Sequence, residues 1–328
     1  MIGSDGVEPL IIYQISFPKN TVLFLLWLKR ISKIEQCMKE IDFICSFGKR
    51  KNGFFRQKYI AQRFYKKIRD SDCDVYFAPA QSELISFGIP DDKKLIYLSD
   101  AVFRLMVGYY WSDLDPRTEH YLDNCEKTAL KRADAVIFAS EWAKAGAMKF
   151  YQTDSRKIHV LPFGANLIDK YQGYQEWNSN DNTIRLLLVG VDWERKGIDI
   201  AIDCVRALNK MQKKYSFDLT IIGVKQPAGQ EYESYIHILG RLNKNIPEGY
   251  ERMISYYQES DLFLLPTKAE CAGIVFAEAA EYGLPSVTHK TGGWRAMWKM
   301  ALQGVACHWA PQEKILQRQS WRSSRMAA

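Results

Sequence analysis

The chain has 328 residues, of which 47% are hydrophobic and 25% charged, values that are normal for a globular protein. This length predicts two domains of ordinary size. The net charge of +7 favours acidic partners, such as phosphates, anionic lipid or nucleic acid, without choosing among them. The longest apolar run, 21–28, is too short to span a bilayer.

The cysteines and the start of the chain indicate a cellular compartment. The seven cysteines are scattered and contain no CxxC pair, which argues against a zinc site or a disulfide framework. Asp5 and Glu8 stand where a signal peptide would be basic. We therefore expect reduced thiols and a cytoplasmic protein, with peripheral contact at the inner face of a membrane as a further possibility.

Residues 1–168 predict an N-terminal domain in which strands and helices alternate. Strands are expected at 10–15, 41–46, 73–78, 94–98, 133–138 and 157–161, and helices at 22–38, 52–70, 119–132 and 140–151. Ser140 is expected to cap the last of these helices. Strands separated by helices imply a parallel sheet with helices on both faces.

Within this domain, residues 29–69 hold thirteen Lys and Arg against three Asp and Glu. One interpretation is a surface for anionic lipid, with aromatic residues near the membrane interface. The alternative is two amphipathic helices with a solvated basic face and an aromatic core face. Nucleic acid is disfavoured because no recognised binding motif accompanies the charge.

A polar stretch without periodicity, 169–182, is the best candidate for a linker. The alternation then restarts in a second domain, 183–293. Strands are expected at 184–190, 217–223, 235–240 and 261–265, and helices at 198–214, 247–258 and from about 273 to 282. The tail, 294–328, holds four of the nine tryptophans and shows no convincing periodicity.

The stretch 261–285 predicts a buried strand, a loop and a helix, which is where open α/β sheets bind ligands. The backbone N–H groups of residues 271–274 (Cys271, Ala272, Gly273, Ile274) would face an anion at the start of the helix. Glu270 precedes this anion site and Glu278 follows it. A nucleotide sugar offers the matching groups, namely a diphosphate for N–H donors and hydroxyls for carboxylates.

A second strand–loop–helix junction lies at 186–199, where Gly190 ends the strand and Arg195 and Lys196 are adjacent cations. These cations would reach the same diphosphate, because Arg offers a planar fork and Lys a point charge. Taken alone, the two cations would be interpreted as a solvated loop pair. Beside a matching anion site in the same domain, binding is the favoured interpretation.

The chain contains a motif of two glutamates, Glu270 and Glu278, separated by seven residues. This motif resembles the donor-site signature of glycosyltransferase family 4, which comprises retaining enzymes of GT-B fold. The resemblance also covers 133–140, 161–166, 186–199, 238–242 and 288–293. It implies an α/β fold with two Rossmann-like domains facing a cleft. No GxGxxG occurs, which disfavours nicotinamide chemistry.

The resemblance also implies a role for each site residue. Lys196 and Arg195 should bind the donor diphosphate, Glu270 the donor sugar and Glu278 the ribose. The backbone around Arg241 and Leu242 should flank the base. No obligatory metal or other cofactor is implied, the nucleotide sugar being a substrate.

Some positions depart from the family pattern. Val191 stands where Arg is usual, and we expect Arg195 to compensate. Ser99 and Asp100 stand in place of a His-Asp pair, so Asp100 is a candidate for acceptor binding, with a helix cap as the alternative. Asp113 and Asp115 spell the DxD of another glycosyltransferase fold, but Pro116 after them favours a helix cap.

Both ends depart from the family as well. The first strand–helix unit is expected to be missing, and the family pattern ends after Gly293. We expect the tail to be aberrant, and a shifted reading frame is one explanation. Codons of residues 296–304 read in another frame can encode Asp-Val-Glu-Asp-Gly-Val-Thr-Gly, which resembles the family at this point.

The predicted function is transfer of a sugar from a nucleotide-sugar donor to a saccharide or lipid-linked acceptor, in synthesis of a cell-surface polysaccharide or glycolipid. Two alternatives stay open: an inactive fragment that binds a nucleotide sugar, and another GT-B enzyme such as a nucleotide-sugar epimerase.

Overall fold

A computed structural model of the chain describes residues 9–11, 63–71, 73–167, 182–211, 214–293 and 304–307. The chain divides into two compact units, Met1–Pro162 and Phe163–Ala328. The expected linker 169–182 lies outside the described residues except for Asn182, as does the tail except for 304–307. The expected strand at 41–46 and helix at 22–38 also lie outside them.

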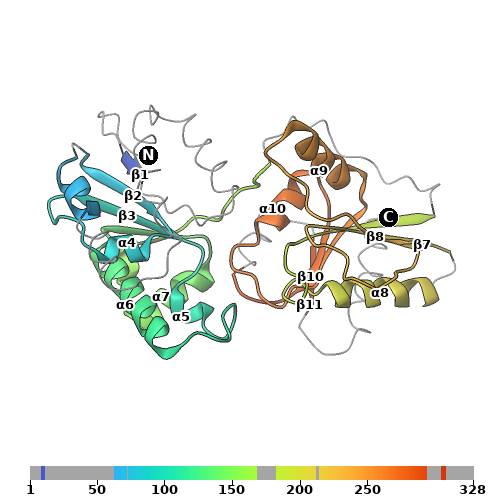
Figure 1. Cartoon of the computed structure of the whole chain (residues 1–328), viewed down its shortest axis with the longest axis horizontal. Helices are drawn as coiled ribbons and strands as arrows, with labels where there is room; N and C mark the ends of the chain where they lie inside the picture. The colour runs from blue at the N-terminus through green and yellow to red at the C-terminus, as the bar shows by residue number, and fades with distance from the viewer. Residues whose placement is uncertain are drawn as a thin grey trace. The chain divides into compact units, whose positions relative to one another are not determined.

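The described part of the N-terminal unit contains a parallel sheet in the order β1-β2-β3-β4-β5. The strands are β1 (Pro9–Ile11), β2 (Val75–Pro79), β3 (Lys94–Ser99), β4 (Ala135–Phe138) and β5 (Ile158–Val160). The connecting helices are α4 (Ser82–Ser86), α5 (Phe103–Met106), α6 (Pro116–Arg132) and α7 (Glu141–Tyr151). These four helices gather on one face of the sheet (Figure 1).

Two predicted helix caps are confirmed. Asp115 accepts hydrogen bonds from the backbone N–H groups of Arg117 and Thr118 at 3.1 and 3.0 Å, and Pro116 is the first helical residue. Ser140 accepts from the N–H of Ala143 at 3.2 Å. The cap proposed as the alternative role of Asp100 is wrong, because α5 begins at Phe103 after Val102.

Of the basic segment, only residues 63–69 are described, and they are helical. Phe64 and Ile68 are buried in the core of the N-terminal unit with Tyr76, whereas Tyr65 is 39% exposed. The described aromatic and apolar residues are therefore divided between the core and the surface, as an amphipathic helix requires.

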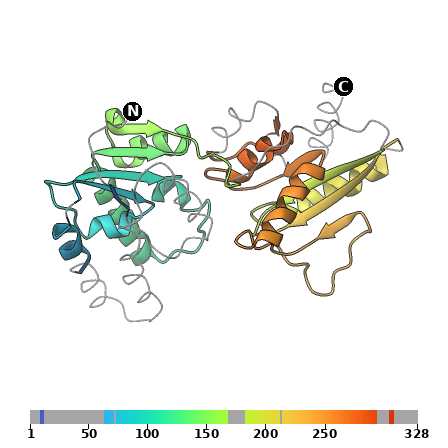
Figure 2. The ribbon, with the colours of Figure 1, turned by 90° about the horizontal axis from the view of Figure 1, so that it is seen from above.

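The described part of the C-terminal unit contains a parallel sheet in the order β11-β10-β9-β6-β7-β8. Its strands are β6 (Thr183–Val189), β7 (Ser216–Ile222), β8 (Ile236–Ile238), β9 (Leu262–Leu265), β10 (Ser286–His289) and β11 (Gly304–Cys307). β6 and β7 run side by side in this sheet (Figure 2).

Three helices complete this unit: α8 (Ile198–Met211), α9 (Pro247–Glu259) and α10 (Ile274–Glu281). α8 lies on one face of the sheet, and α9 and α10 lie on the other (Figure 1). The strand order reverses between β6 and β9, so the loops that follow these two strands diverge to opposite faces. Open α/β sheets bind ligands at such a switch point, beyond the carboxyl ends of the strands.

Candidate active site

The loops after β6 and β9 pack closely at the switch point because glycine occupies two positions. A Cβ added to Gly190 would lie 2.7 Å from Cγ of Lys196. A Cβ added to Gly197 would lie 2.2 Å from the carbonyl oxygen of Pro266, and Gly197 also has a φ of +67°. Gly190 therefore gives the Lys196 side chain its path, and Gly197 lets the two loops touch.

Lys196 and Glu270 form an ion pair across these loops, with Nζ of Lys196 donating to Oε2 of Glu270. Both residues are buried, at 6% and 8% exposure. Nη1 of Arg195 lies 3.9 Å from the same carboxylate oxygen. Two cations thus converge on one carboxylate, and Nε of Arg195 also lies 3.8 Å from the Asp192 carboxylate. An anionic ligand could replace the Glu270 carboxylate as the partner of both cations.

Backbone contacts fix the register of the two loops. The Thr267 hydroxyl donates to the carbonyls of Arg195 and Ala269 at 3.1 and 3.0 Å. The N–H of Lys268 donates to the Arg195 carbonyl at 2.7 Å, and Nη1 of Arg195 donates to the Ala269 carbonyl at 3.0 Å. Thr267 is fully buried, so its hydroxyl acts as an internal tie between the loops.

The loop after β10 supports the same structure from the other side. The N–H of Gly293 donates to the Glu270 carbonyl at 3.2 Å, and the Thr291 hydroxyl donates to the Lys268 carbonyl at 3.1 Å. His289, at the end of β10, is 3% exposed. Burial lowers the pKa of His289 to about 4, against a hydrogen bond to the Thr267 backbone that raises it. His289 is therefore neutral at pH 7.

The helix expected near Gly273 begins at Ile274 as α10. Gly273 is its N-cap residue, with a φ of +69°, and among the described residues no side chain caps this helix. A Cβ on Gly273 would lie 2.8 Å from the Phe276 ring. Cys271 and Ala272 are buried in the preceding turn. First-turn N–H groups of such a helix favour an acceptor from outside it.

Glu278, in α10, is 2% exposed, and each of its carboxylate oxygens has a partner. The Tyr257 hydroxyl donates to Oε2 and Nζ of Lys244 donates to Oε1, both at 2.9 Å. Burial raises the pKa of Tyr257 well above its usual value, and the charge of Glu278 raises it further. Neither Lys244, in a polar loop, nor Tyr257, on the core face of a helix, carries a signal in the sequence that predicts this contact.

The other three residues predicted for the site lie outside the contact of Lys196, Arg195 and Glu270. Arg241 and Leu242 lie in the loop after β8, where Leu242 packs against the core of the C-terminal unit. Asp100 directly follows β3 in the N-terminal unit. The structure thus brings together Lys196, Arg195 and Glu270, whereas Asp100 belongs to the other unit.

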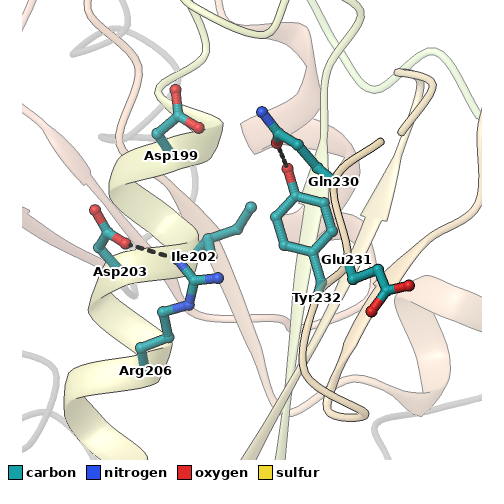
Figure 3. Close-up of a pocket in the computed structure, with 7 residues that line it drawn as sticks. All are labelled: Asp199, Ile202, Asp203, Arg206, Gln230, Glu231 and Tyr232. Atoms are coloured by element: carbon teal, nitrogen blue, oxygen red, sulfur yellow. Dashed lines mark hydrogen bonds and ion pairs between the residues drawn. The ribbon is translucent and has the colours of Figure 1, made fainter. Parts of the chain in front are cut away.

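A separate pocket of about 410 Å³ lies between α8 and the loop before β8 (Figure 3). Its lining residues are Asp199, Ile202, Asp203, Arg206, Gln230, Glu231 and Tyr232. Arg206 contacts Asp203 at 3.2 Å and the Glu233 carboxylate at 2.8 and 3.0 Å. With its cation occupied and three carboxylates around it, this pocket is unsuited to a diphosphate.

The described residues also bear on metal sites and on membrane-spanning helices. No group of three or more His, Cys, Asp or Glu among them is arranged to hold a metal ion. None of the helices in the described ranges is both long and apolar enough to cross a membrane.

Cys73, Cys125, Cys204 and Cys271 are free thiols. The metal-independent chemistry implied by the resemblance stays a prediction.

Comparison with known proteins supports the resemblance found in the sequence. Residues 172–318 match the family described as glycosyl transferases group 1. The lipopolysaccharide glucosyltransferase WaaG of Escherichia coli K12 is 31% identical over 160 residues, which cover 46% of this chain and 42% of WaaG. The chain spans about half the length of the curated relatives it matches.

Solved structures show the fold. The crystal structure of WaaG superposes with a TM-score of 0.63 at 19% identity, covering 97% of this chain and 90% of that one. The lipopolysaccharide outer core galactosyltransferase WaaB gives a TM-score of 0.65 at 13% identity, covering 98% and 91%. The chain therefore has the α/β GT-B fold of these glycosyltransferases, as predicted from the sequence.

Proposed function

We propose that this chain is a retaining glycosyltransferase of family 4 that uses a nucleotide-sugar donor. The observation that carries the proposal is the contact of buried Lys196 and half-buried Arg195 with buried Glu270 at the switch point of the C-terminal sheet. Two cations, a carboxylate and a helix start without a capping side chain match the diphosphate and sugar of such a donor.

Each residue then has a role in binding. Lys196 and Arg195 bind the diphosphate together with N–H groups at the start of α10. Glu270 turns from Lys196 to the hydroxyls of the donor sugar, since the phosphate replaces it as the partner of the cation. Glu278 accepts from the ribose, and the backbone at Arg241 and Leu242 flanks the base.

The chemical step breaks the bond between the anomeric carbon and the diphosphate oxygen. Negative charge develops on that oxygen, and Lys196, Arg195 and the α10 N–H groups stabilise it in a preorganised site. The acceptor hydroxyl attacks from the face that the diphosphate leaves, which retains the anomeric configuration. Its proton passes to the departing diphosphate, and Asp100 holds the acceptor.

The acceptor is proposed to be a saccharide or a lipid-linked saccharide of a cell-surface polysaccharide or glycolipid. The similarity to WaaG and WaaB, both of which act in lipopolysaccharide synthesis, supports this class. Peripheral contact of residues 29–69 with anionic lipid would bring the chain to such an acceptor.

A donor screen tests the proposal. Release of nucleoside diphosphate is measured with UDP-, GDP-, ADP- and dTDP-sugars, with extracted acceptor lipid present and without added metal. We expect release with one donor and its loss in Lys196→Ala and Glu278→Ala; normal turnover in both variants would contradict the assigned site. Binding without turnover would indicate an inactive binder, and epimerised donor without acceptor would indicate an epimerase.

A further inference from the structure

Lys244 and Glu278 form an ion pair. The proposed function gives Glu278 a role but gives none to Lys244. Nζ of Lys244 lies 2.9 Å from Oε1 of Glu278, and the two side chains are 11% and 2% exposed. The Tyr257 hydroxyl holds the other oxygen, Oε2, at 2.9 Å. The carboxylate is therefore held from two sides, by the loop after β8 and by α9.

The loop that carries Lys244 is itself a fixed turn. Oδ1 of Asn243 accepts from the backbone N–H and the side-chain amide of Asn245 at 3.1 and 3.0 Å. The carbonyl of Asn243 accepts from the N–H of Ile246 at 3.2 Å. A Cβ on Gly249 would lie 2.4 Å from that carbonyl, so this glycine lets α9 pack against the turn. Lys244 consequently starts from a defined backbone position.

The charge of Lys244 matters because Glu278 is almost completely buried. A buried carboxylate is costly unless a cation or several donors compensate it. The Tyr257 hydroxyl is neutral, and Lys244 is the cation in ion-pair contact with Glu278 in the described part of the chain. An ionised carboxylate has about four acceptor positions, so two partners leave capacity for a pair of neighbouring hydroxyls.

We propose that Lys244 is a positioning residue that compensates the buried carboxylate of Glu278 and orients it, and that this gives the site its requirement for ribose hydroxyls. The inference rests on the proposed function, because it needs a nucleotide at Glu278. Lys244 acts through Glu278 and does not itself contact the ribose. It therefore determines how strongly the site distinguishes a ribonucleotide from its dideoxy counterpart.

Calorimetric binding of a nucleoside diphosphate and its 2′,3′-dideoxy analogue tests this directly. The nucleoside diphosphate chosen for the test is the one that wild-type protein binds most tightly among the ribose forms of UDP, GDP, ADP and TDP. Hydrogen bonds to a charged group predict that wild type binds the ribose form roughly tenfold or more tightly. Lys244→Met should reduce this preference to less than about threefold, and Lys244→Arg should restore most of it.

A matched control variant and a double-mutant cycle with Glu278 separate a positioning role from a general loss of structure. Lys94→Met breaks an exposed lysine–carboxylate pair with Asp134 and should keep the wild-type preference. In a Glu278→Gln background, Lys244→Met should cause no further change in the preference, because its effect passes through Glu278. A further change there would show direct contact with the ribose and overturn the proposal.

The remaining outcomes are also decisive. A wild-type preference retained in Lys244→Met would overturn the inference, as would equal weakening of both ligands. If Lys244→Met does not fold, Lys244→Gln carries the same prediction, because its amide can still donate but has no charge. If wild-type protein binds no nucleoside diphosphate, the proposed function fails, and this inference, which needs a nucleotide at Glu278, fails with it; loss of the preference in the lysine variants alone concerns only the inference.

Discussion

Lys196 and Glu270, 74 residues apart in the chain, meet in a buried ion pair between the loops that follow β6 and β9. These strands are neighbours in the sheet, and their loops leave toward helices on opposite faces. The pair therefore lies at the switch point of the sheet, where open α/β sheets bind ligands. In the proposed complex the donor separates the two side chains, because each becomes a partner of the donor.

Gly190→Ala should weaken nucleotide binding although it replaces no binding side chain. The added methyl would lie 2.7 Å from Cγ of Lys196, so the lysine must leave its path. Loss of a charge-assisted hydrogen bond predicts roughly ten- to hundredfold weaker binding of a nucleoside diphosphate. Calorimetry measures this. Gly164→Ala is the control, since its methyl meets no described atom within 4 Å and affinity should stay unchanged.

Thr267→Val should loosen the two loops while preserving shape. The hydroxyl that ties them is lost, but the carbonyls of Arg195 and Ala269 keep donors from Lys268 and from the Arg195 guanidinium. We expect a loss of about 1 kcal/mol in the free energy of unfolding, measured in urea. Thr128→Val, at an exposed position of α6, should change it by less than about 0.5 kcal/mol. If Thr267→Val and Thr128→Val changed the free energy of unfolding equally, the Thr267 hydroxyl would not stabilise the two loops.

Glu126 should make the N-terminal unit less stable as pH rises. Burial raises its pKa to about 8, although the Tyr97 hydroxyl donates to both carboxylate oxygens at 3.2 Å. The folded unit then holds a proton that the unfolded chain releases near pH 4.5, so unfolding free energy falls between about pH 4.5 and 8. In Glu126→Gln, the free energy of unfolding measured in urea should fall less across this pH range than it does in wild type. An unchanged pH profile would contradict the assignment.

His289 should act with the opposite sign in the C-terminal unit. Its pKa is lowered by burial from 6.5 to about 4, so the unfolded chain binds a proton that the folded unit does not. Unfolding free energy should therefore fall as pH drops from about 6.5 to 4. His289→Gln keeps a donor for the Thr267 backbone and should remove this acid dependence. A variant that loses stability with acid as steeply as wild type would show that another group is responsible.

The sequence predicted most of the fold that positions the site. Long apolar runs such as 184–190 and 217–223 became β6 and β7 within one residue of the expected bounds, because central parallel strands are hydrophobic on both faces. The short elements α4, α5, β10 and β11 were not expected. Four or five residues carry too little periodicity to separate a strand or helix from a loop.

The site was predictable where residue type and strand context coincide. Lys196, Glu270 and the start of α10 follow buried strands, and parallel strands bring such loops to one edge. Lys244 was not predictable, because a lysine in a polar loop is ordinarily solvated. Only the fold shows that its ammonium reaches the buried carboxylate of Glu278.

Calorimetric titration of UDP, GDP, ADP and dTDP into wild type and Lys196→Met tests the central claim most directly, with Lys94→Met as the surface control. We predict that one nucleotide binds wild type and the control equally, and binds Lys196→Met roughly tenfold or more weakly. The account would be contradicted if none of the four bound wild type, or if Lys196→Met bound as tightly as wild type.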